Sequence, residues 1–285
     1  MNRALLQWYG PRRDRYPWRR DPDPYRVLVS EIMLQQTQVS RVAPAFERFV
    51  AEFPDVPALA AASRAAVLRA WGSLGYNRRA VALHAAARDI VARFDGAVPT
   101  DPEALQTLPG VGPYTAAAVA SLGFGAVVPA IDTNVVRVVG RARLGTDGAP
   151  VGDVRAAAAA WIDRGDPAGW NQAVMDLGRD VCRPAPRCGE CPLAPGCAFR
   201  RADAVPGRTR RRQPAFEGSF RQTRGAVVRA LRSRPSASLA QLAAELGQPL
   251  HRTAAAVGAL HADGVVAAGP AALAGRAAGR VRLPI

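Results

Sequence analysis

The feature that most constrains the fold is a short run with two glycines, Leu108-Pro109-Gly110-Val111-Gly112-Pro113-Tyr114-Thr115, which leads into an alanine-rich segment. We predict a turn at Gly110 and Gly112 that is too tight for residues with a Cβ, followed by a helix that tolerates Pro113 in its first turn. Free N–H groups at the start of a helix bind a phosphate without reading any base. The alternative is an ordinary connection between two helices.

Helical periodicity dominates the first 200 residues. From Tyr25 to about Gly123, apolar residues recur every three or four positions, and prolines and glycines separate short helices. A second helical group runs from Ile131 to Phe199, and no alternating strand pattern precedes residue 200. We therefore predict an all-α core made of short helices.

The charge of the chain indicates a polyanionic partner. The net charge is +15, from 38 basic and 23 acidic residues, and every basic residue is arginine. Such an excess favours nucleic acid over a merely soluble basic surface. Without lysine, the chain has no side-chain amine that could form a Schiff base with a sugar aldehyde. No apolar run is long enough to span a membrane or to form a signal peptide, so we expect a cytoplasmic protein.

The last third of the chain differs from the core. Residues 201–215 contain the basic run Arg208–Arg212, which is either a solvated linker or an arm that contacts phosphates. We predict a small winged-helix-like α+β domain over residues 216–285. Three helices are expected there: one over Arg221–Leu231, one that begins with a capping box at Ser238–Gln241 and ends at Gly247, and one over Leu250–Ala262. Two strands are expected at Val265-Val266 and Arg280–Leu283, as in a winged-helix domain.

The four cysteines, Cys182, Cys188, Cys191 and Cys197, lie within sixteen positions with the spacing Cys-x5-Cys-x2-Cys-x5-Cys. A disulfide framework is not expected in a cytosolic protein. Four clustered thiols on loops indicate either a structural zinc site or an iron–sulfur cluster.

Two carboxyl groups stand out as candidates for acid–base chemistry. Glu31 lies in an apolar helix, where desolvation would raise its pKa and let it carry a proton near neutrality. Asp132 opens a helix, whose N-terminus would stabilise its ionised form. Each also has an ordinary interpretation, as a partly exposed glutamate and a helix-capping aspartate. A protonated and an ionised carboxyl together are what cleavage of an N-glycosidic bond needs.

Residues 1 to about 200 resemble the MutY-type adenine DNA glycosylases of the helix-hairpin-helix superfamily, in the Gly110 run, in Ser30-Glu31 through Leu34-Gln35-Gln36-Thr37, in Ile131 to Arg137, and in the cysteines. The resemblance implies a six-helix barrel over residues 25–130. It also implies an iron–sulfur subdomain from residues 1–24 and 131–200, although the first cysteine gap is one residue shorter than usual. The family's nudix-like C-terminal domain is not matched by residues 216–285, as in some actinobacterial members.

The resemblance also implies roles for individual residues. Glu31 would protonate adenine, and Asp132, oriented by Asn134, would stabilise the sugar cation beside Tyr114. Trp18, Arg19 and Gln172 would line the adenine pocket, and Gly110 and Gly112 would bind phosphate. Residues that would insert around the opposite base are Leu34, Gln36, Thr37 and Tyr76, and the four cysteines would hold a four-iron four-sulfur cluster.

The expected function is excision of adenine mispaired with 8-oxoguanine or guanine, by a monofunctional enzyme. The expected partner is double-stranded DNA with mismatched or oxidised pairs, bound by a nucleoid-associated monomer with no membrane contact. One alternative is a thymine or uracil mismatch glycosylase of the same fold, in which Tyr114 would be shared but Glu31 would usually be absent. Another is a non-catalytic DNA-binding protein. A lyase of the endonuclease III type is disfavoured because the chain has no lysine.

Overall fold

A computed structural model describes residues 1–205 and 215–285. The basic run Arg208–Arg212 lies outside the described residues. Contacts divide the described chain into two compact units. The first contains Met1–Ile32 and residues 98–205, and the second contains Met33–Ala97 and residues 215–285. The finer domain boundaries expected from the sequence stay predictions. No described helix is long and apolar enough to cross a membrane.

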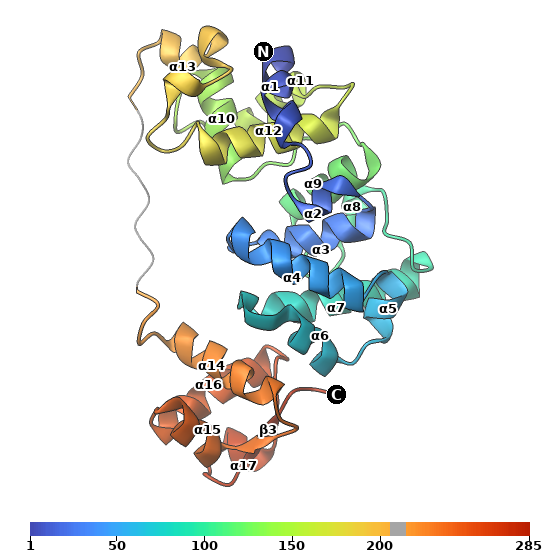
Figure 1. Ribbon diagram of the computed structural model, residues 1–285, viewed down its shortest axis with the longest axis vertical. Helices are drawn as coiled ribbons and strands as arrows, with labels where there is room; N and C mark the ends of the chain where they lie inside the picture. The colour runs from blue at the N-terminus through green and yellow to red at the C-terminus, as the bar shows by residue number, and fades with distance from the viewer. Residues whose placement is uncertain (206–214) are drawn as a thin grey trace. The chain divides into compact units, whose positions relative to one another are not determined.

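The first unit is entirely helical in its described part (Figure 1). Helices α1, α10, α11 and α12 enclose a core that includes Leu5, Val139, Trp161 and Trp170. The α-helices of its described part are α1 (Asn2–Tyr9), α2 (Pro17–Arg20), most of α3 (Pro24–Leu34), α8 (Pro102–Gln106), α9 (Pro113–Phe124), α10 (Thr133–Leu144), α11 (Val151–Trp161), α12 (Pro167–Asp180) and α13 (Ala198–Arg201).

The two glycines before α9 differ in what they contribute. Gly110 has a φ of +79°, a left-handed conformation that favours glycine. Gly112 has a φ of −93°, and a Cβ built on it would meet nothing within 4 Å. The tight turn therefore requires a glycine at Gly110 only, which corrects the expectation for Gly112. What Gly112 provides is open space at the start of α9, which no side chain caps.

The second unit contains four α-helices from the predicted all-α region, namely α4 (Val39–Glu52), α5 (Val56–Ala61), α6 (Arg64–Trp71) and α7 (Arg78–Phe94). Helix α7 packs against both α5 and α6. Asp55 and Ser63 cap α5 and α6 by accepting from backbone N–H groups. The aromatic rings of Phe49 and Trp71 meet edge to face in the interior of this unit.

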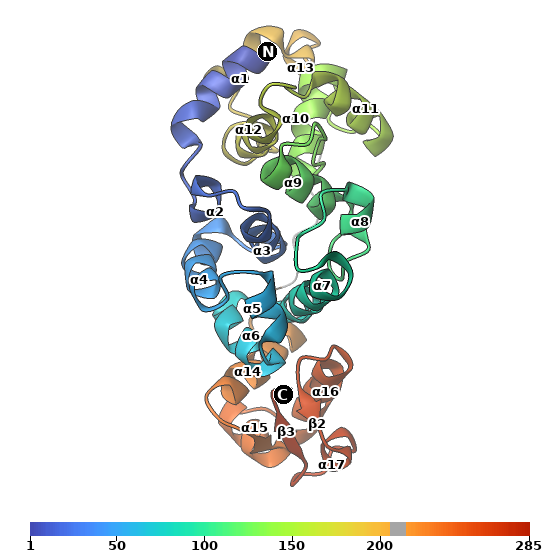
Figure 2. The same cartoon turned by 90° about the vertical axis from the view of Figure 1, so that its right-hand side faces the viewer.

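The C-terminal part has the three predicted helices, α14 (Phe220–Arg232), α15 (Leu239–Leu246) and α16 (Leu250–Ala262). Ser238 and Gln241 form the predicted capping box, and α15 ends at Gly247 in the left-handed conformation. The sheet differs from the expectation, because it has three antiparallel strands in the order β1-β3-β2. Figure 2 shows β2 beside β3.

The strands are β1 (Ala237–Ser238), β2 (Ala267–Ala268) and β3 (Arg280–Arg282), with the short helix α17 (Pro270–Leu273) between the last two. The strand predicted at Val265-Val266 lies two residues further on, at Ala267–Ala268. Val265 and Val266 are both buried in the core, so they lack the alternation of exposed and buried positions that marks a strand at the surface. Strand β1 was missed because two small residues carry no strand pattern.

Candidate active site

Glu31 lies in the middle of α3, between apolar residues that are buried with it. Its side chain is 5 % exposed, and Oε2 accepts a hydrogen bond of 2.8 Å from the hydroxyl of Tyr114, near the start of α9. Burial raises the pKa of Glu31 from 4.5 to about 7; the charge of Asp132 adds to the rise, and the Tyr114 hydrogen bond opposes it. The pKa of Tyr114 is itself raised well above its usual range by burial, so this hydroxyl stays a donor.

Asp132 precedes α10 and caps it. Its Oδ1 accepts from the backbone N–H of Val135 at 2.7 Å, and its Oδ2 accepts from the amide of Asn134 at 2.8 Å. These donors favour the ionised carboxylate, as predicted from the sequence. Burial nevertheless raises the pKa of Asp132 above its ordinary value, which the sequence did not indicate.

Arg137 links Asp132 to the cysteine segment, a role that the sequence did not suggest. One amino group of Arg137 donates to Oδ1 of Asn134 and to the carbonyl of Gly178, both at 2.7 Å. Its Nε donates to the carbonyl of Cys182 at 2.6 Å. A Cβ on Gly178 would come within 2.6 Å of the Asn134 Cβ, so glycine lets α12 approach α10 closely enough for these bonds.

One face of α12 carries three side chains toward the same region. Asp176 pairs with both amino groups of Arg19 at 2.8 and 2.9 Å, and both side chains are almost fully buried. The sulfur of Met175 lies 3.7 Å from the Tyr114 hydroxyl. Gln172 accepts a hydrogen bond from the hydroxyl of Tyr9. One face of α12 therefore carries Gln172 and the ion-pair partner of Arg19 beside Met175, which contacts Tyr114. The predicted roles of Arg19 and Gln172 in base binding stay predictions.

Trp18 is 5 % exposed, and its ring stacks on Tyr16 with centroids 5.2 Å apart. The Arg19 guanidinium lies 5.0 Å from the Tyr16 ring centroid. Tyr16 thus contacts both Trp18 and Arg19, and the buried indole of Trp18 presents little surface for a base to stack on.

In the second unit, Arg79 of α7 connects the two loops expected to insert into DNA. It donates to the carbonyl of Met33 at 2.7 Å, to the carbonyl of Gln35, and to the Thr37 hydroxyl at 2.9 Å. It also lies over the ring of Tyr76 at 5.4 Å. Gln36 and Tyr76, at φ values of +56° and +47°, are both exposed and strained, as is common at functional loops. Leu34 ends α3 and is half-buried.

The four cysteines line one small cavity of about 20 Å³, room for about one water molecule. None forms a disulfide. As the side chains stand, no group of three or more His, Cys, Asp or Glu in the described part of the chain is arranged to hold a metal ion. The donor set nevertheless suits an iron–sulfur cluster, because four thiols line one cavity together with apolar side chains and the three arginines Arg141, Arg187 and Arg200.

Arg141 supports the first cysteine segment. It is 1 % exposed, pairs with both oxygens of Asp147 at 2.8 Å, and donates to the carbonyls of Arg183 and Pro184 at 2.7 and 3.1 Å. A further N–H points to the Cys182 sulfur at 3.7 Å. The short gap between Cys182 and Cys188 is therefore held by a buried cation.

Comparisons with known proteins agree with this geometry. Residues 29–164 match the family described as HhH-GPD superfamily base excision DNA repair protein. A relative named adenine DNA glycosylase from Mycolicibacterium smegmatis is 47% identical over 202 residues, which cover 70% of this chain and 69% of the relative. This chain belongs to the adenine DNA glycosylase family.

A more distant member of the adenine DNA glycosylase family matches a similar share of this chain. The human adenine DNA glycosylase is 38% identical over 214 residues, which cover 70% of this chain and 39% of the human protein.

Among solved structures, a thermostable thymine-DNA glycosylase is similar, with a TM-score of 0.65 and 28% identity over 70% of this chain and 94% of that chain. An endonuclease III–DNA covalent intermediate shares the fold, with a TM-score of 0.60 and 23% identity over 70% of this chain and 93% of that chain.

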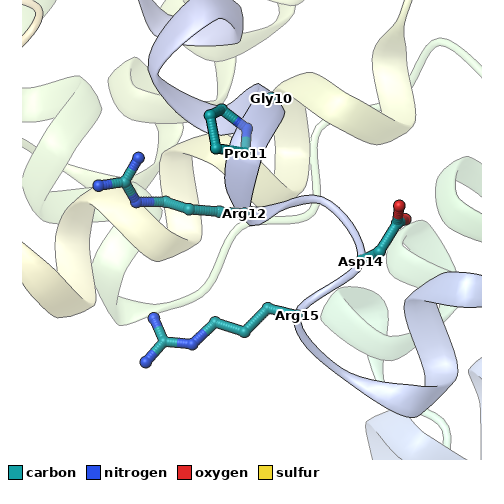
Figure 3. A pocket seen from close by; sticks show the side chains of 5 residues that line it. All are labelled: Gly10, Pro11, Arg12, Asp14 and Arg15. Atoms are coloured by element: carbon teal, nitrogen blue, oxygen red, sulfur yellow. The ribbon is translucent and has the colours of Figure 1, made fainter.

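A larger hollow of about 680 Å³ lies at the end of α1 and is separate in its lining from the Glu31 centre. It is lined by Gly10, Pro11, Arg12, Asp14 and Arg15. Figure 3 shows the Arg12 and Arg15 side chains extending to the same side, while Asp14 points away. Arg12 also lies over the Trp8 ring at 4.2 Å, and Arg15 pairs with Asp180 at 3.6 Å. This hollow is a basic surface rather than a second catalytic centre.

Proposed function

We propose that this member of the adenine DNA glycosylase family hydrolyses adenine that is mispaired with 8-oxoguanine or guanine, without lyase activity. The observation that carries the proposal is the buried Glu31, whose pKa of about 7 is set by burial and which is hydrogen-bonded to Tyr114. A carboxyl group with this pKa is matched to general acid catalysis near neutral pH.

The reaction depends on two carboxyl groups in different protonation states. Protonated Glu31 donates its proton to the leaving adenine as the bond between the sugar carbon and the base nitrogen breaks, and the bonding electrons leave with the base. The Asp132 carboxylate, held by Val135 and Asn134, stabilises the positive charge that develops on the sugar. Water then attacks the sugar carbon and returns a proton to Glu31.

The absence of lysine supports a monofunctional enzyme. A lyase step by an amine nucleophile needs a Schiff base with the opened sugar. Tyr114 occupies the helix position beside Glu31, and its hydroxyl cannot form such an adduct.

Three surfaces are suited to the DNA backbone. The uncapped start of α9 has open space beside Gly112. The strained loops at Gln36 and Tyr76 are exposed. In the C-terminal part, Arg280 and Arg282 are exposed on the same face of the central strand β3, and Arg276 just before it is also exposed.

Arg252, at the start of α16, is less suited to contact DNA than these exposed arginines are. Arg252 donates to the Thr223 hydroxyl at 3.2 Å and to the carbonyl of Gly218, so its guanidinium holds the domain together. We therefore assign phosphate contacts to the sheet arginines, where they would add affinity without base selectivity.

We also propose that Cys182, Cys188, Cys191 and Cys197 hold a four-iron four-sulfur cluster, toward which their side chains would have to turn. Such a cluster would order the loop between α12 and α13. The hydrogen bonds from Arg137 and Arg141 to this segment connect its backbone to Asn134, and so to Asp132.

The test is excision on matched duplexes that carry adenine opposite 8-oxoguanine, adenine opposite guanine, or thymine opposite guanine. Strand breaks after alkali on the adenine duplexes alone are the expected result. Cleavage of the thymine duplex instead would establish the mismatch alternative, and no excision of any base would establish a binding protein. Borohydride trapping should give no stoichiometric protein–DNA adduct, since a trapped adduct would contradict the monofunctional reaction.

A further inference from the structure

Tyr9 and Gln172 form a hydrogen bond that neither the motifs nor the resemblance pointed to. Tyr9 ends α1 and is 0% exposed, and its hydroxyl donates to Oε1 of Gln172 on α12. Gln172 is only half-buried, so the far end of its amide is accessible. Its amide nitrogen has no hydrogen-bond partner among the described residues.

The direction of this bond is fixed by chemistry. Burial raises the pKa of Tyr9 to about 12, so the hydroxyl keeps its proton. A buried hydroxyl needs an acceptor for that proton, and of the two ends of a glutamine amide only the carbonyl oxygen can accept. Gln172 is therefore held with Oε1 toward Tyr9 and its NH2 group at the other end.

Gln172 shares one face of α12 with residues that contact the Glu31 centre. On α12 it is three and four residues before Met175 and Asp176, so the three side chains share one face of the helix. Met175 contacts the Tyr114 hydroxyl that binds Glu31, and Asp176 binds Arg19. A base that receives a proton from Glu31 would have this face of α12 beside it.

We propose that Tyr9 is a positioning residue that sets base selection, by fixing Gln172 so that the site offers an N–H donor to the edge of the extruded base. The proposal rests on the proposed excision of adenine. Adenine has an acceptor at ring nitrogen N1, whereas guanine has an N–H donor there. A fixed donor therefore binds adenine and leaves two donors facing each other with guanine, a mismatch that sites of this kind reject strongly.

The experiment compares Tyr9→Phe with the wild type in the full chain, which keeps the ring and removes only the hydroxyl. Single-turnover excision is measured for adenine and for 1-deazaadenine, which lacks the N1 acceptor but keeps N7. The wild type should favour adenine. In Tyr9→Phe this preference should shrink by about tenfold or more, because the Gln172 side-chain amide can then flip and exchange its N–H donor for its carbonyl acceptor. The affinity for duplex should stay unchanged.

Taking the ratio of the two rates cancels intrinsic differences between the bases and any general loss of activity. Tyr16→Phe removes a second hydroxyl near Arg19 that takes no part in the Gln172 bond, and should keep the wild-type ratio. Gln172→Glu replaces the donor with an acceptor and should also lower the preference, which provides a second variant if Tyr9→Phe does not fold.

An unchanged ratio in Tyr9→Phe, with or without an equal loss on both bases, would show that the bond is only structural and would overturn the proposal. If Tyr9→Phe does not fold, an unchanged ratio in Gln172→Glu would overturn it. Wild-type protein that excises no adenine would instead overturn the proposed function. The two failures are therefore distinguishable in one set of assays.

Discussion

The hydroxyl of Tyr114 donates a 2.8 Å hydrogen bond to Oε2 of Glu31, across 83 residues of sequence. The bond leaves the second oxygen of Glu31 as the one that can carry a transferable proton. It also opposes the rise in the Glu31 pKa that burial causes. Tyr114 thus orients the acid and limits the rise in its pKa at the same time.

Glu31→Gln removes the proton donor and keeps the shape of the side chain. Excision of adenine should fall by about two to four orders of magnitude, while affinity for the duplex stays close to wild type. Single-turnover kinetics and a binding titration measure the two effects. Glu47→Gln on α4 is an exposed control and should excise at the wild-type rate. Wild-type excision by Glu31→Gln would remove Glu31 from the mechanism.

The pKa of Glu31 predicts a pH dependence of stability. From pH 4.5 to about 7, Glu31 is ionised in the unfolded chain but protonated in the folded one, so the folded state loses stability as pH rises. The shift corresponds to about 3 kcal/mol at most. Glu31→Gln should therefore be more stable than wild type at pH 8 and nearly equal to it at pH 4. Urea unfolding of both proteins measures this, and a difference independent of pH would show that the group is not buried as an acid.

Asp132→Asn removes the negative charge that would stabilise the sugar cation. We expect a loss of excision by about two orders of magnitude or more with duplex binding retained. Asp101→Asn provides a matched control, because Asp101 caps α8 in the same way but is exposed. Measured side by side, the control should excise normally. Equal excision by both variants would reduce Asp132 to a helix cap.

Anaerobically prepared protein should contain iron at about four atoms per chain rather than zinc. The reason is that four thiols, none in a disulfide, line one cavity, whose lining also includes the buried cation Arg141. Elemental analysis and the absorption spectrum measure this. Stoichiometric zinc without iron would contradict it, and so would iron retained when Cys188 and Cys191 are both changed to Ser.

Removing the two arginines on the outer face of β3, by Arg280→Ala with Arg282→Ala, should weaken binding to every duplex. The salt dependence should become shallower by about one unit of slope per lost phosphate contact, while the preference for a particular opposite base stays unchanged. The pair Arg155→Ala with Arg164→Ala removes the same charge from exposed positions in the first unit and should have a smaller effect. A lost preference with unchanged affinity would mean that this face reads the lesion.

Local chemistry made part of this protein predictable from its sequence. Helix α16 has the predicted bounds, the capping box at Ser238 starts α15, and Gly110 takes the left-handed turn. These features depend on residues a few positions apart, so a short window of sequence contains their cause. The Glu31 and Asp132 motifs were likewise visible, because a carboxyl in an apolar helix and one before a helix are both local signals.

The tertiary structure alone decided how those residues work. The hydrogen bond from Tyr9 to Gln172 joins positions 163 residues apart, and Arg137 reaches Cys182 across 45. Arg252 is held by the carbonyl of Gly218 and the hydroxyl of Thr223, about thirty residues before it in the sequence. The pKa of Glu31 depends on how completely other helices exclude water from it. Burial and distant partners are properties of packing, and a pattern along one helix specifies which face is buried but not what meets it.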